Sequence, residues 1–328
     1  MKVYYDSDVE QDILTGRKVA IIGYGNQGRA QGLNMRDSGV QVIVGSIRDT
    51  SYERAVQDGF AAMPIPEAVA QADVICLLVP DEVQQEIYGR DIAPHLRAGQ
   101  ALNFAHGYNI RYGLIEPPAD VDVIMVAPRM IGVGVRERFE AGTGAAAFVA
   151  VEQDATGQAW PVTLAIAKAI GATRAGVIET TFAEETELDH FMEQAVWPVI
   201  TRLLRLSFEF LRDKGYQPEA ILMELYASGE AAEIFSEMMN VGLFRQMDFH
   251  SRTSQYGTLS RGLRMLPDTF RIRMAEALAE IRDGTFAKEW EADRQNGFPA
   301  YNRLKEEARA HEINAVEDRI RSLVKPEQ

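Results

Sequence analysis

A glycine-rich loop, Gly23-Tyr24-Gly25-Asn26-Gln27-Gly28, is the clearest group of residues whose types and spacing predict a chemistry. It fits G-x-G-x-x-G, follows the apolar run Val19–Ile22 and opens a helical pattern at Asn26–Asp37, which is the context in which this pattern binds a dinucleotide. The first glycine permits the tight turn, the second lets a pyrophosphate approach the backbone, and the third lets the helix pack closely on the strand. The N–H groups at the start of the helix favour phosphate oxygens. A glycine turn of some other α/β fold is the alternative interpretation.

The residues after the second expected strand, Val42–Gly45, indicate which dinucleotide the loop takes. An NAD-binding domain places Asp or Glu there to hold the ribose 2′-hydroxyl. Here a glycine and a serine occupy this position, Arg48 can pair with a 2′-phosphate, and Thr50 and Ser51 offer hydroxyl donors. Asp49 argues the other way, because an inward carboxylate would repel that phosphate. A solvated loop charge is the alternative for Arg48, and the balance favours NADPH.

A pair of carboxylates at helical spacing is the second candidate for chemistry. Asp189 and Glu193 stand at i, i+4, so both project from one face of a helix. Hard divalent cations such as Mg²⁺ prefer carboxylate oxygens. The alternative is a solvated acidic face, because further glutamates stand at 184, 185 and 187. The residues alone leave these two interpretations equal.

A histidine follows the fourth expected strand, Ala101–Phe104. His106, next to Gly107, therefore lies at the carboxyl edge of the sheet, where α/β proteins build their sites. A lone histidine is otherwise more often a structural residue with satisfied hydrogen bonds.

Composition and charge exclude several classes of function. The chain has 328 residues, 46% hydrophobic and 25% charged, which is ordinary for a globular protein of about two domains. The formal net charge of −14 argues against nucleic-acid and anionic-membrane partners, although a basic pocket for an anionic substrate is compatible with it. No run approaches the roughly 18 apolar residues of a membrane span, and the first residues carry no secretion signal. We therefore expect a cytoplasmic protein, with Cys76 as a core thiol.

The two halves of the chain have different hydrophobic patterns. Up to about residue 177, short apolar runs alternate with helical patterns, which predicts a doubly wound parallel α/β sheet of the Rossmann type. The runs are Val19–Ile22, Val42–Gly45, Val74–Val79, Ala101–Phe104, Val121–Ala127 and Ala146–Val151. After Thr180 helices are expected instead, over Ala183–Lys214, Pro218–Met239 and Phe270–Asp283. We expect a dinucleotide-binding domain at residues 1–181 and an all-helical domain at residues 182–328.

The whole chain resembles the short (class I) form of ketol-acid reductoisomerase. The resembling stretches are Met1–Asp6, Gly23–Gly28, Pro80–Gln84, Phe104–Ile110, Asp120–Pro128, Arg174–Phe182, Glu184–Glu187 and Glu193–Val196. The resemblance implies an N-terminal Rossmann domain and a helical, knotted C-terminal domain that forms a homodimer. It also implies NADPH and two Mg²⁺ ions, and an alkyl migration in 2-acetolactate or 2-aceto-2-hydroxybutyrate followed by hydride reduction, in branched-chain amino-acid synthesis.

The resemblance implies roles for individual residues. Asp189 and Glu193 become metal ligands, and His106 lies near the metals and the nicotinamide. Asp81 and Gln84 are expected beside the cofactor, and residue 251, a serine, aligns with one that hydrogen-bonds the substrate carboxylate. Alkyl migration needs a deprotonated hydroxyl and a polarised ketone, and two hard cations supply both.

The sequence departs from the family pattern at three places where functional residues are expected. Arg129 stands in the expected catalytic pocket where the family has lysine, and a planar, always-charged fork is not equivalent to a compact ammonium. Arg29 replaces a histidine after the glycine loop, and we expect it to be an extra phosphate contact. Trp197-Pro198-Val199-Ile200 replaces Leu-Cys-Gly-Gly, and a proline inside a helical pattern predicts a kink or local rearrangement.

A fourth departure concerns the second metal site, for which the family supplies two glutamates at i, i+4. Counting forward from the preceding turn aligns Glu224 with the first glutamate and Ser228 with the second. Counting back from the following motif aligns Tyr226 with the first and Glu230 with the second. A two-residue insertion is implied, and Glu224 and Glu230, six apart, point to different faces of a regular helix.

Three functions follow from these observations. The first is an NADPH-dependent oxidoreductase of the ketol-acid reductoisomerase type, with Ser251 on the substrate and Glu224 and Glu230 joining Asp189 and Glu193 at the metals. The second is a diverged reductase of a small 2-keto acid or imine that has lost alkyl migration. The third is a catalytically silent NADPH-binding partner protein. A homodimer or higher homo-oligomer is expected in each case.

Overall fold

The computed structural model describes residues 2–10 and 12–323, so the outer ends of the two expected domains, residues 1 and 328, lie outside it. The chain forms two compact units that meet between Leu188 and Asp189, inside helix α9 (Phe182–Phe191). The boundary expected after residue 181 lies at the start of that helix. The acidic residues of α9 are therefore divided between the two units.

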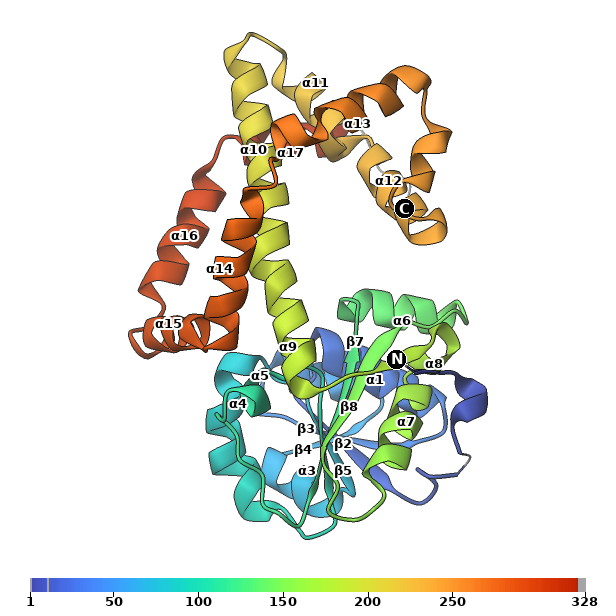
Figure 1. Cartoon of the computed structure of the whole chain (residues 1–328). Helices are drawn as coiled ribbons and strands as arrows, with labels where there is room; N and C mark the ends of the chain where they lie inside the picture. The colour runs from blue at the N-terminus through green and yellow to red at the C-terminus, as the bar shows by residue number, and fades with distance from the viewer. Residues whose placement is uncertain (1, 11, 324–328) are drawn as a thin grey trace. The chain divides into compact units, whose positions relative to one another are not determined.

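The first unit is built on a nine-stranded sheet with the order β1-β9-β8-β7-β6-β5-β2-β3-β4 among the described residues (Figure 1). The six apolar runs of the sequence form its central strands, which confirms the Rossmann-type fold. Strands β4, β3, β2, β5, β6 and β7 are mutually parallel, whereas β8 pairs antiparallel with β7 and β1 pairs antiparallel with β9. The sheet is therefore mixed rather than wholly parallel. The strands are β1 Val3–Tyr4, β2 Lys18–Ile22, β3 Gln41–Gly45, β4 Ala61–Met63, β5 Val74–Leu77, β6 Ala101–Phe104, β7 Asp122–Pro128, β8 Ala147–Gln153 and β9 Val177–Glu179.

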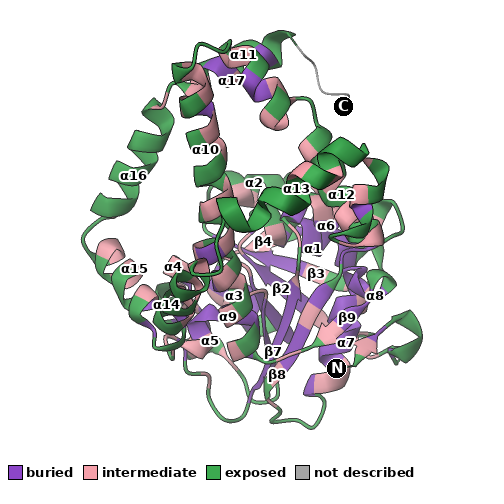
Figure 2. Ribbon diagram, turned by 45° about the horizontal axis from the view of Figure 1, so that its top comes forward, coloured by how far each residue is buried: buried purple, intermediate pink, exposed green. Residues whose placement is uncertain are grey.

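Two apolar layers hold helices against the two faces of this sheet. One layer joins β2, β5 and β7 to α1 and α7, and the other joins the opposite faces of these strands to α3 and to Phe182 at the start of α9. The central strands are buried along nearly their whole length (Figure 2). Full burial of one large aliphatic side chain such as Ile21 stabilises the fold by about 1.5–3 kcal/mol. The helices are α1 Asn26–Asp37, α2 Thr50–Gln57, α3 Ile65–Gln71, α4 Asp81–Ile87, α5 Tyr108–Arg111, α6 Gly132–Glu140, α7 Ala159–Ala169 and α8 Ala172–Ala175.

The second unit is helical throughout its described residues, as the loss of strand pattern predicts. Two of the expected long helices contain π-helical segments, Met192–Val196 before α10 and Met223–Ala227 after α11. The first directly precedes Trp197-Pro198, so the rearrangement expected from this proline is confirmed. The remaining helices are α10 Trp197–Asp213, α11 Pro218–Leu222, α12 Glu230–Val241, α13 Arg252–Met265, α14 Phe270–Arg282, α15 Thr285–Gln295, α16 Pro299–Ala310 and α17 Ile313–Leu323.

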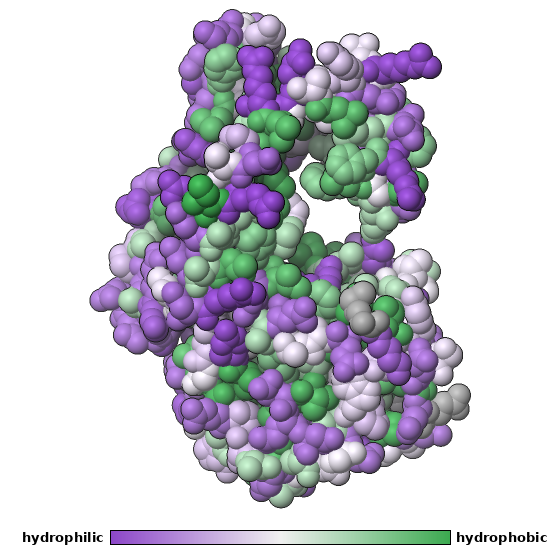
Figure 3. Space-filling view, in the orientation of Figure 1, coloured by the Kyte–Doolittle hydropathy of each residue, from purple (hydrophilic) through white to green (hydrophobic). Residues whose placement is uncertain are grey.

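Large apolar side chains remain exposed on this second unit. Among the described residues, the main hydrophobic core of this unit is small. It centres on Phe208 and Leu222, with α10, α11 and α17 packed around them. Helices α12 and α13 are mostly exposed (Figure 2), and hydrophobic side chains lie among polar ones on the surface of this unit (Figure 3). The exposed residues of α12, α13 and the turn between them include Phe235, Met239, Phe244, Phe249, Leu259 and Leu263. Within the described part of the chain, the helices are too short or too polar to cross a membrane.

Candidate active site

The glycine loop adopts the conformation that its sequence predicts. Gly23 has φ = 90°, and a Cβ there would lie 2.5 Å from a methyl carbon of Val79. A Cβ at Gly28 would lie 1.9 Å from the Gly23 carbonyl oxygen, so helix α1 packs directly on the turn. A Cβ at Gly25 would meet no atom within 4 Å, which leaves its backbone open to a pyrophosphate. Asn26 is exposed and starts α1, so the first N–H groups of this helix face the same opening.

A polar cluster that runs from a buried tyrosine to an exposed arginine lies beneath the loop. The Tyr24 ring is only 1% exposed, so its side chain belongs to the core, and its hydroxyl donates to Asp58 Oδ2 at 2.9 Å. Arg29 donates to both oxygens of Asp58, at 2.7 and 3.1 Å. The Arg29 guanidinium holds the pKa of the Asp58 carboxyl below its usual value, and burial raises the pKa of Tyr24. We expected Arg29 to contact a phosphate. In the structure two of its N–H groups instead donate to Asp58 and so link α1 to the end of α2.

In the segment between β3 and α2, the Asp49 carboxylate is bound to the backbone of α2, which weakens the expected repulsion of a 2′-phosphate. Asp49 caps helix α2, and its Oδ1 accepts the backbone N–H groups of Ser51 and Tyr52 at 3.0 Å each. Its carboxylate is thus directed at the helix and stabilised by the positive end of the helix dipole. Arg48 is exposed and its guanidinium carbon lies 5.9 Å from the centroid of the Tyr52 ring. Thr50 is the first residue of α2 and is also exposed, so hydroxyl and guanidinium donors lie together at this sheet edge.

Hydrogen bonds from the side-chain amides of Gln84 and Asn109 hold the loop between β5 and α4 in place. Gln84 is 5% exposed, and its Nε2 donates to the carbonyl of Val79 at 2.9 Å and to Asp81 Oδ1 at 3.1 Å. Asn109 in turn donates to Gln84 Oε1 at 3.1 Å. Gln84, expected to contact the cofactor, therefore shapes the loop on which Asp81 stands.

Glu185 is the centre of an ion cluster that joins three elements of the first unit. Its side chain is fully buried, and Oε2 accepts from Gly107 N at 2.8 Å and from His106 Nδ1 at 2.9 Å. Arg129 Nη1 donates to Oε1 at 2.8 Å. Since the carboxylate can only accept, Nδ1 of His106 carries a hydrogen, and the neutral ring has its lone pair on Nε2. His106 and Arg129, both expected as catalytic, are thus brought together by a residue that the sequence did not single out.

Gly107 explains how Glu185 reaches this position. A Cβ on Gly107 would lie 2.5 Å from the carbonyl oxygen of Phe182 and 2.6 Å from Thr186 Oγ1. The first turn of α9 therefore rests on the backbone of residue 107, which only glycine allows, and Glu185 faces the turn after β6. The sequence signal was present, because Glu185 precedes Asp189 and Glu193 at intervals of four and shares their helical face. Glu185 could not be distinguished from its acidic neighbours by sequence alone, because further glutamates stand at 184 and 187.

Asp189 stands one turn after Glu185 on α9. His106, Glu185 and Asp189 each offer a ligand atom, and these atoms all lie within 4.8 Å of one another. Glu193 lies in the following π-helical segment with its side chain 60% exposed, 3.8 Å from His190 Nδ1. The oxygens of Glu185 already accept three protein donors, so a hard cation bound there would compete with these hydrogen bonds.

The second acidic pair is interrupted, as the implied insertion predicts. Glu224 lies in the π-helical segment that ends at Ala227, whereas Glu230 is the first residue of α12. Between them Gly229 has φ = 90°, so the helix breaks there. Both glutamates are exposed. Ser251 caps α13, where its Oγ accepts from Ser254 N at 3.2 Å.

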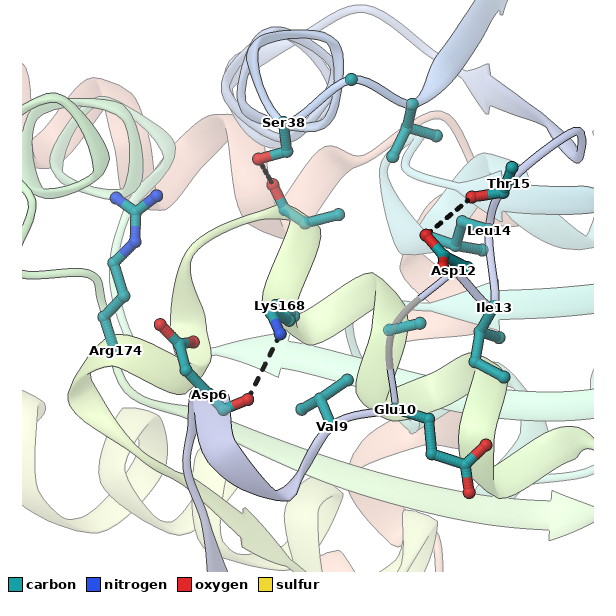
Figure 4. Close-up of a pocket in the computed structure, with 14 residues that line it drawn as sticks. Asp6, Val9, Glu10, Asp12, Ile13, Leu14, Thr15, Ser38, Lys168 and Arg174 are labelled. Carbon is teal, nitrogen blue, oxygen red and sulfur yellow. Dashed lines mark hydrogen bonds between the residues drawn. The ribbon is translucent and has the colours of Figure 1, made fainter.

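A cavity of about 380 Å³ lies elsewhere on the first unit, at the ends of α1 and α7 (Figure 4). Two hydrogen bonds join its lining residues across the ends of these elements: Ser38 Oγ donates to the Ala169 carbonyl at 2.8 Å, and Lys168 Nζ donates to the Asp6 carbonyl at 3.3 Å. None of its described lining residues belongs to the glycine loop or to the ion cluster. A smaller cavity of about 270 Å³ borders the glycine loop at Gly25 and Asn26 and contains Arg54.

Two protein-family models match successive parts of the chain. Residues 13–176 match the NADPH-binding domain of acetohydroxy acid isomeroreductase. Residues 182–326 match the C-terminal domain of ketol-acid reductoisomerase.

Individual relatives agree with these models. The ketol-acid reductoisomerase (NADP(+)) of Pyrobaculum calidifontis is 47% identical over 98% of both chains. That of Saccharopolyspora erythraea is 46% identical over 98% of this chain and 97% of its own. An NADH-preferring ketol-acid reductoisomerase from an uncultured archaeon superimposes with a TM-score of 0.96 at 38% identity, covering 99% of this chain and all of that one.

Proposed function

The chain belongs to the ketol-acid reductoisomerase family, and from this premise we propose how its residues divide the work of NADPH-dependent isomeroreduction. The activity is that of an oxidoreductase acting on a small acetohydroxy acid in branched-chain amino-acid synthesis. The observation that carries the assignment of roles is the Glu185 cluster, which gathers His106 and Arg129 at the carboxyl edge of the sheet.

The glycine loop and the start of α1 bind the pyrophosphate of NADPH. The open backbone at Gly25 and the unpaired N–H groups of the first helical turn supply the contacts. Arg48, with Thr50 and Ser51, binds the 2′-phosphate, because Asp49 is committed to capping α2. NADPH bound there supplies the hydride that reduces the substrate carbonyl.

Glu185 holds two groups in place for the reacting acid. It accepts a hydrogen bond from His106 Nδ1, so the imidazole keeps one ring orientation and one tautomer. It also holds Arg129, whose guanidinium places a positive charge beside His106 that can stabilise a carboxylate or an enolate-like oxygen. Arginine thus supplies the positive charge that lysine supplies in the family.

Asp189 and Glu193 hold Mg²⁺ at the end of this cluster. The donor set fits, since both are carboxylates on successive turns and the ligand atom of Asp189 lies within 4.8 Å of those of His106 and Glu185. When bound, Mg²⁺ polarises the ketone and lowers the pKa of the neighbouring hydroxyl. Glu224, Glu230 and Ser251 are exposed in the single chain, and we assign the two glutamates to a second cation and Ser251 to the substrate carboxylate.

Asp189→Asn tests this assignment. We expect loss of at least about 100-fold in Mg²⁺-dependent turnover, with the Kd for NADPH changed less than about twofold, because the dinucleotide site lies on other elements. Fluorescence titration of NADPH and a steady-state assay give the two values. Glu184→Gln is the matched control, since Glu184 is exposed and accepts only from Thr180 nearby. A large loss of NADPH affinity in the Asp189 variant would contradict the model.

The helical unit also predicts self-association. Its described core is small, and the apolar residues of α12 and α13 are exposed. We therefore propose that the chain works as a homodimer or a higher homo-oligomer. Light scattering at micromolar concentration is expected to give at least twice the 36.5 kDa of one chain, and a stable monomer would overturn this proposal.

A further inference from the structure

The turn that carries Arg129 is attached to the glycine loop by one side chain. Gln27, inside the loop motif, donates from Nε2 to the carbonyl of Met130 at 2.8 Å. Met130 directly follows Arg129 in the sequence. The two residues are 103 positions apart in the sequence. This hydrogen bond is therefore a long-range contact between the glycine loop and the turn after β7.

The amide of Gln27 is held in one orientation. Its Oε1 accepts from Gln31 Nε2 at 3.1 Å, one turn along α1, and Gln31 is fully buried. With the oxygen committed there, the nitrogen faces Met130 O, and the reverse placement would bring two oxygens together. The orientation of the bridging donor is therefore determined by the protein and does not depend on solvent.

The backbones of the two elements also touch. A Cβ on Gly132, the first residue of α6, would lie 2.1 Å from the Asn26 carbonyl oxygen and 2.9 Å from Gln27 N. Helices α1 and α6 are neighbours in the fold (Figure 2), and the start of α6 contacts the first turn of α1 at Gly132. Neither the glycine loop nor the turn after β7 can move without displacing the other.

Arg129 is anchored on its other side by the sheet. Its backbone N–H donates to the Ala146 carbonyl at 2.9 Å, and its guanidinium carbon lies 5.1 Å from the centroid of the Phe148 ring. The side chain then reaches Glu185 at 2.8 Å. Gln27 therefore holds the Met130–Ile131 peptide, one residue beyond Arg129, while the sheet and Glu185 hold Arg129 itself.

We propose that Gln27 is a positioning residue that couples occupancy of the pyrophosphate site to the placement of Arg129 on Glu185 and, through Glu185, of His106. Phosphate oxygens draw on the N–H groups of the first turn of α1, which includes residue 27. The Gln27 amide and the Gly132 contact transmit the resulting shift to the turn after β7. The proposal rests on the catalytic roles given above to Arg129 and His106, but its coupling step involves neither Mg²⁺ nor substrate.

A cofactor fragment tests the coupling without turnover. 2′-Phospho-ADP-ribose carries the pyrophosphate but lacks the nicotinamide, so it fills the loop and does not reach His106 directly. In the wild-type chain we expect it to shift the imidazole proton resonances of His106, one of five histidines, assigned by comparison with a His106→Asn spectrum. In Gln27→Met, which keeps side-chain length and removes the donor, we expect binding within about threefold by calorimetry and no shift. An unchanged shift in Gln27→Met would overturn the proposal.

A double-mutant cycle separates positioning from a purely structural effect. We expect Gln27→Met to lower kcat about tenfold with little change in the KM for NADPH, and to have almost no further effect in an Arg129→Lys background. Additive losses would overturn the coupling. Asn34→Ser is the matched control, because Asn34 also ties α1 to α6, through the Val135 carbonyl at 3.3 Å, but at a distance from the turn. It should lower the melting temperature and leave kcat unchanged.

The fragment-binding spectra and the turnover assay distinguish failure of the coupling from failure of the proposed function. If the wild-type chain turns over no acetohydroxy acid but the fragment shifts His106 only when Gln27 is present, the coupling stands and the proposed function fails. If Gln27→Met does not fold, Gln31→Met, which removes only the donor to Gln27 Oε1, should give a smaller shift than wild type in the same spectrum. A full wild-type shift in Gln31→Met would then count against the proposal.

Discussion

Beneath the glycine loop the polar side chains pair with one another, whereas on α12, α13 and the turn between them large apolar side chains are exposed. Tyr24, Asp58 and Arg29 form a closed network in the first region. In the second region, Phe244 and Leu263 are 67% and 72% exposed. The dinucleotide-binding unit thus pairs these polar groups within one chain, while the helical unit exposes apolar surface of the kind that the proposed self-association would cover.

The same contrast holds for the groups that do chemistry. The ion cluster around Glu185 is fixed by backbone contacts at Gly107 and by three hydrogen bonds. Glu224 and Glu230 have no such frame in the described chain, because a π-helical segment and the break at Gly229 separate them. We infer that the first site is preorganised and that the second acquires its geometry on assembly.

The largest expected effect in the first region comes from adding one methyl group to the loop. Gly28→Ala places a Cβ 1.9 Å from the Gly23 carbonyl oxygen, so it should lower the free energy of unfolding by about 3 kcal/mol and NADPH affinity by more than about tenfold. Gly25→Ala meets no atom within 4 Å and should lose roughly tenfold in affinity with unchanged stability. Urea unfolding and NADPH titration measure both. Equal stability of the two variants would contradict the packing described here.

Removal of the buried carboxylate charge should have the next largest effect. Glu185→Gln keeps one accepting oxygen but removes the negative charge that Arg129 and His106 share, so kcat should fall about 10- to 100-fold. Stability should also fall, by about 3 kcal/mol, because one partner of a buried ion pair is left uncompensated. NADPH affinity should stay within about twofold of wild type. If kcat were unchanged, Glu185 would be a structural residue only.

The smallest expected effect is the pH dependence of the network beneath the loop. Because Arg29 lowers the pKa of Asp58 in the folded chain, this carboxylate stabilises the fold above its unfolded pKa of about 3.9, and the contribution is lost as pH falls through the folded value. Asp58→Asn should therefore be less stable than wild type at pH 7, by at most about 1 kcal/mol for a partly exposed pair. The difference should shrink on acidification in urea melts. A difference that grows toward low pH would contradict this sign.

The sequence predicted the central strands and α1 well, because buried parallel strands and a glycine-rich turn leave strong local patterns. It did not predict β1, β4 and β9, whose two or three residues are too few to show a period. The reversed direction of β8 also has no local signal, since strand direction depends on which edge the chain returns to.

The candidate site was predictable in part for similar reasons. His106 could be named from its position after a strand and Arg129 from its departure from the family pattern, and the structure joins them in one cluster. Glu185 was hidden in an acidic run, because burial of one glutamate among several depends on the contact between α9 and Gly107. The buried positions of Tyr24 and Gln84 likewise depend on partners distant in sequence, Asp58 and Asn109.

The central claim is that the chain catalyses the full isomeroreduction although arginine stands at position 129. The most direct measurement is the oxidation of NADPH by the purified protein with 2-acetolactate, with and without Mg²⁺, beside the pre-isomerised 3-hydroxy-2-keto acid. We predict Mg²⁺-dependent oxidation of NADPH with both substrates. Oxidation with the pre-isomerised acid alone would show that alkyl migration has been lost, and binding of NADPH without turnover on either acid would contradict the enzymatic function itself.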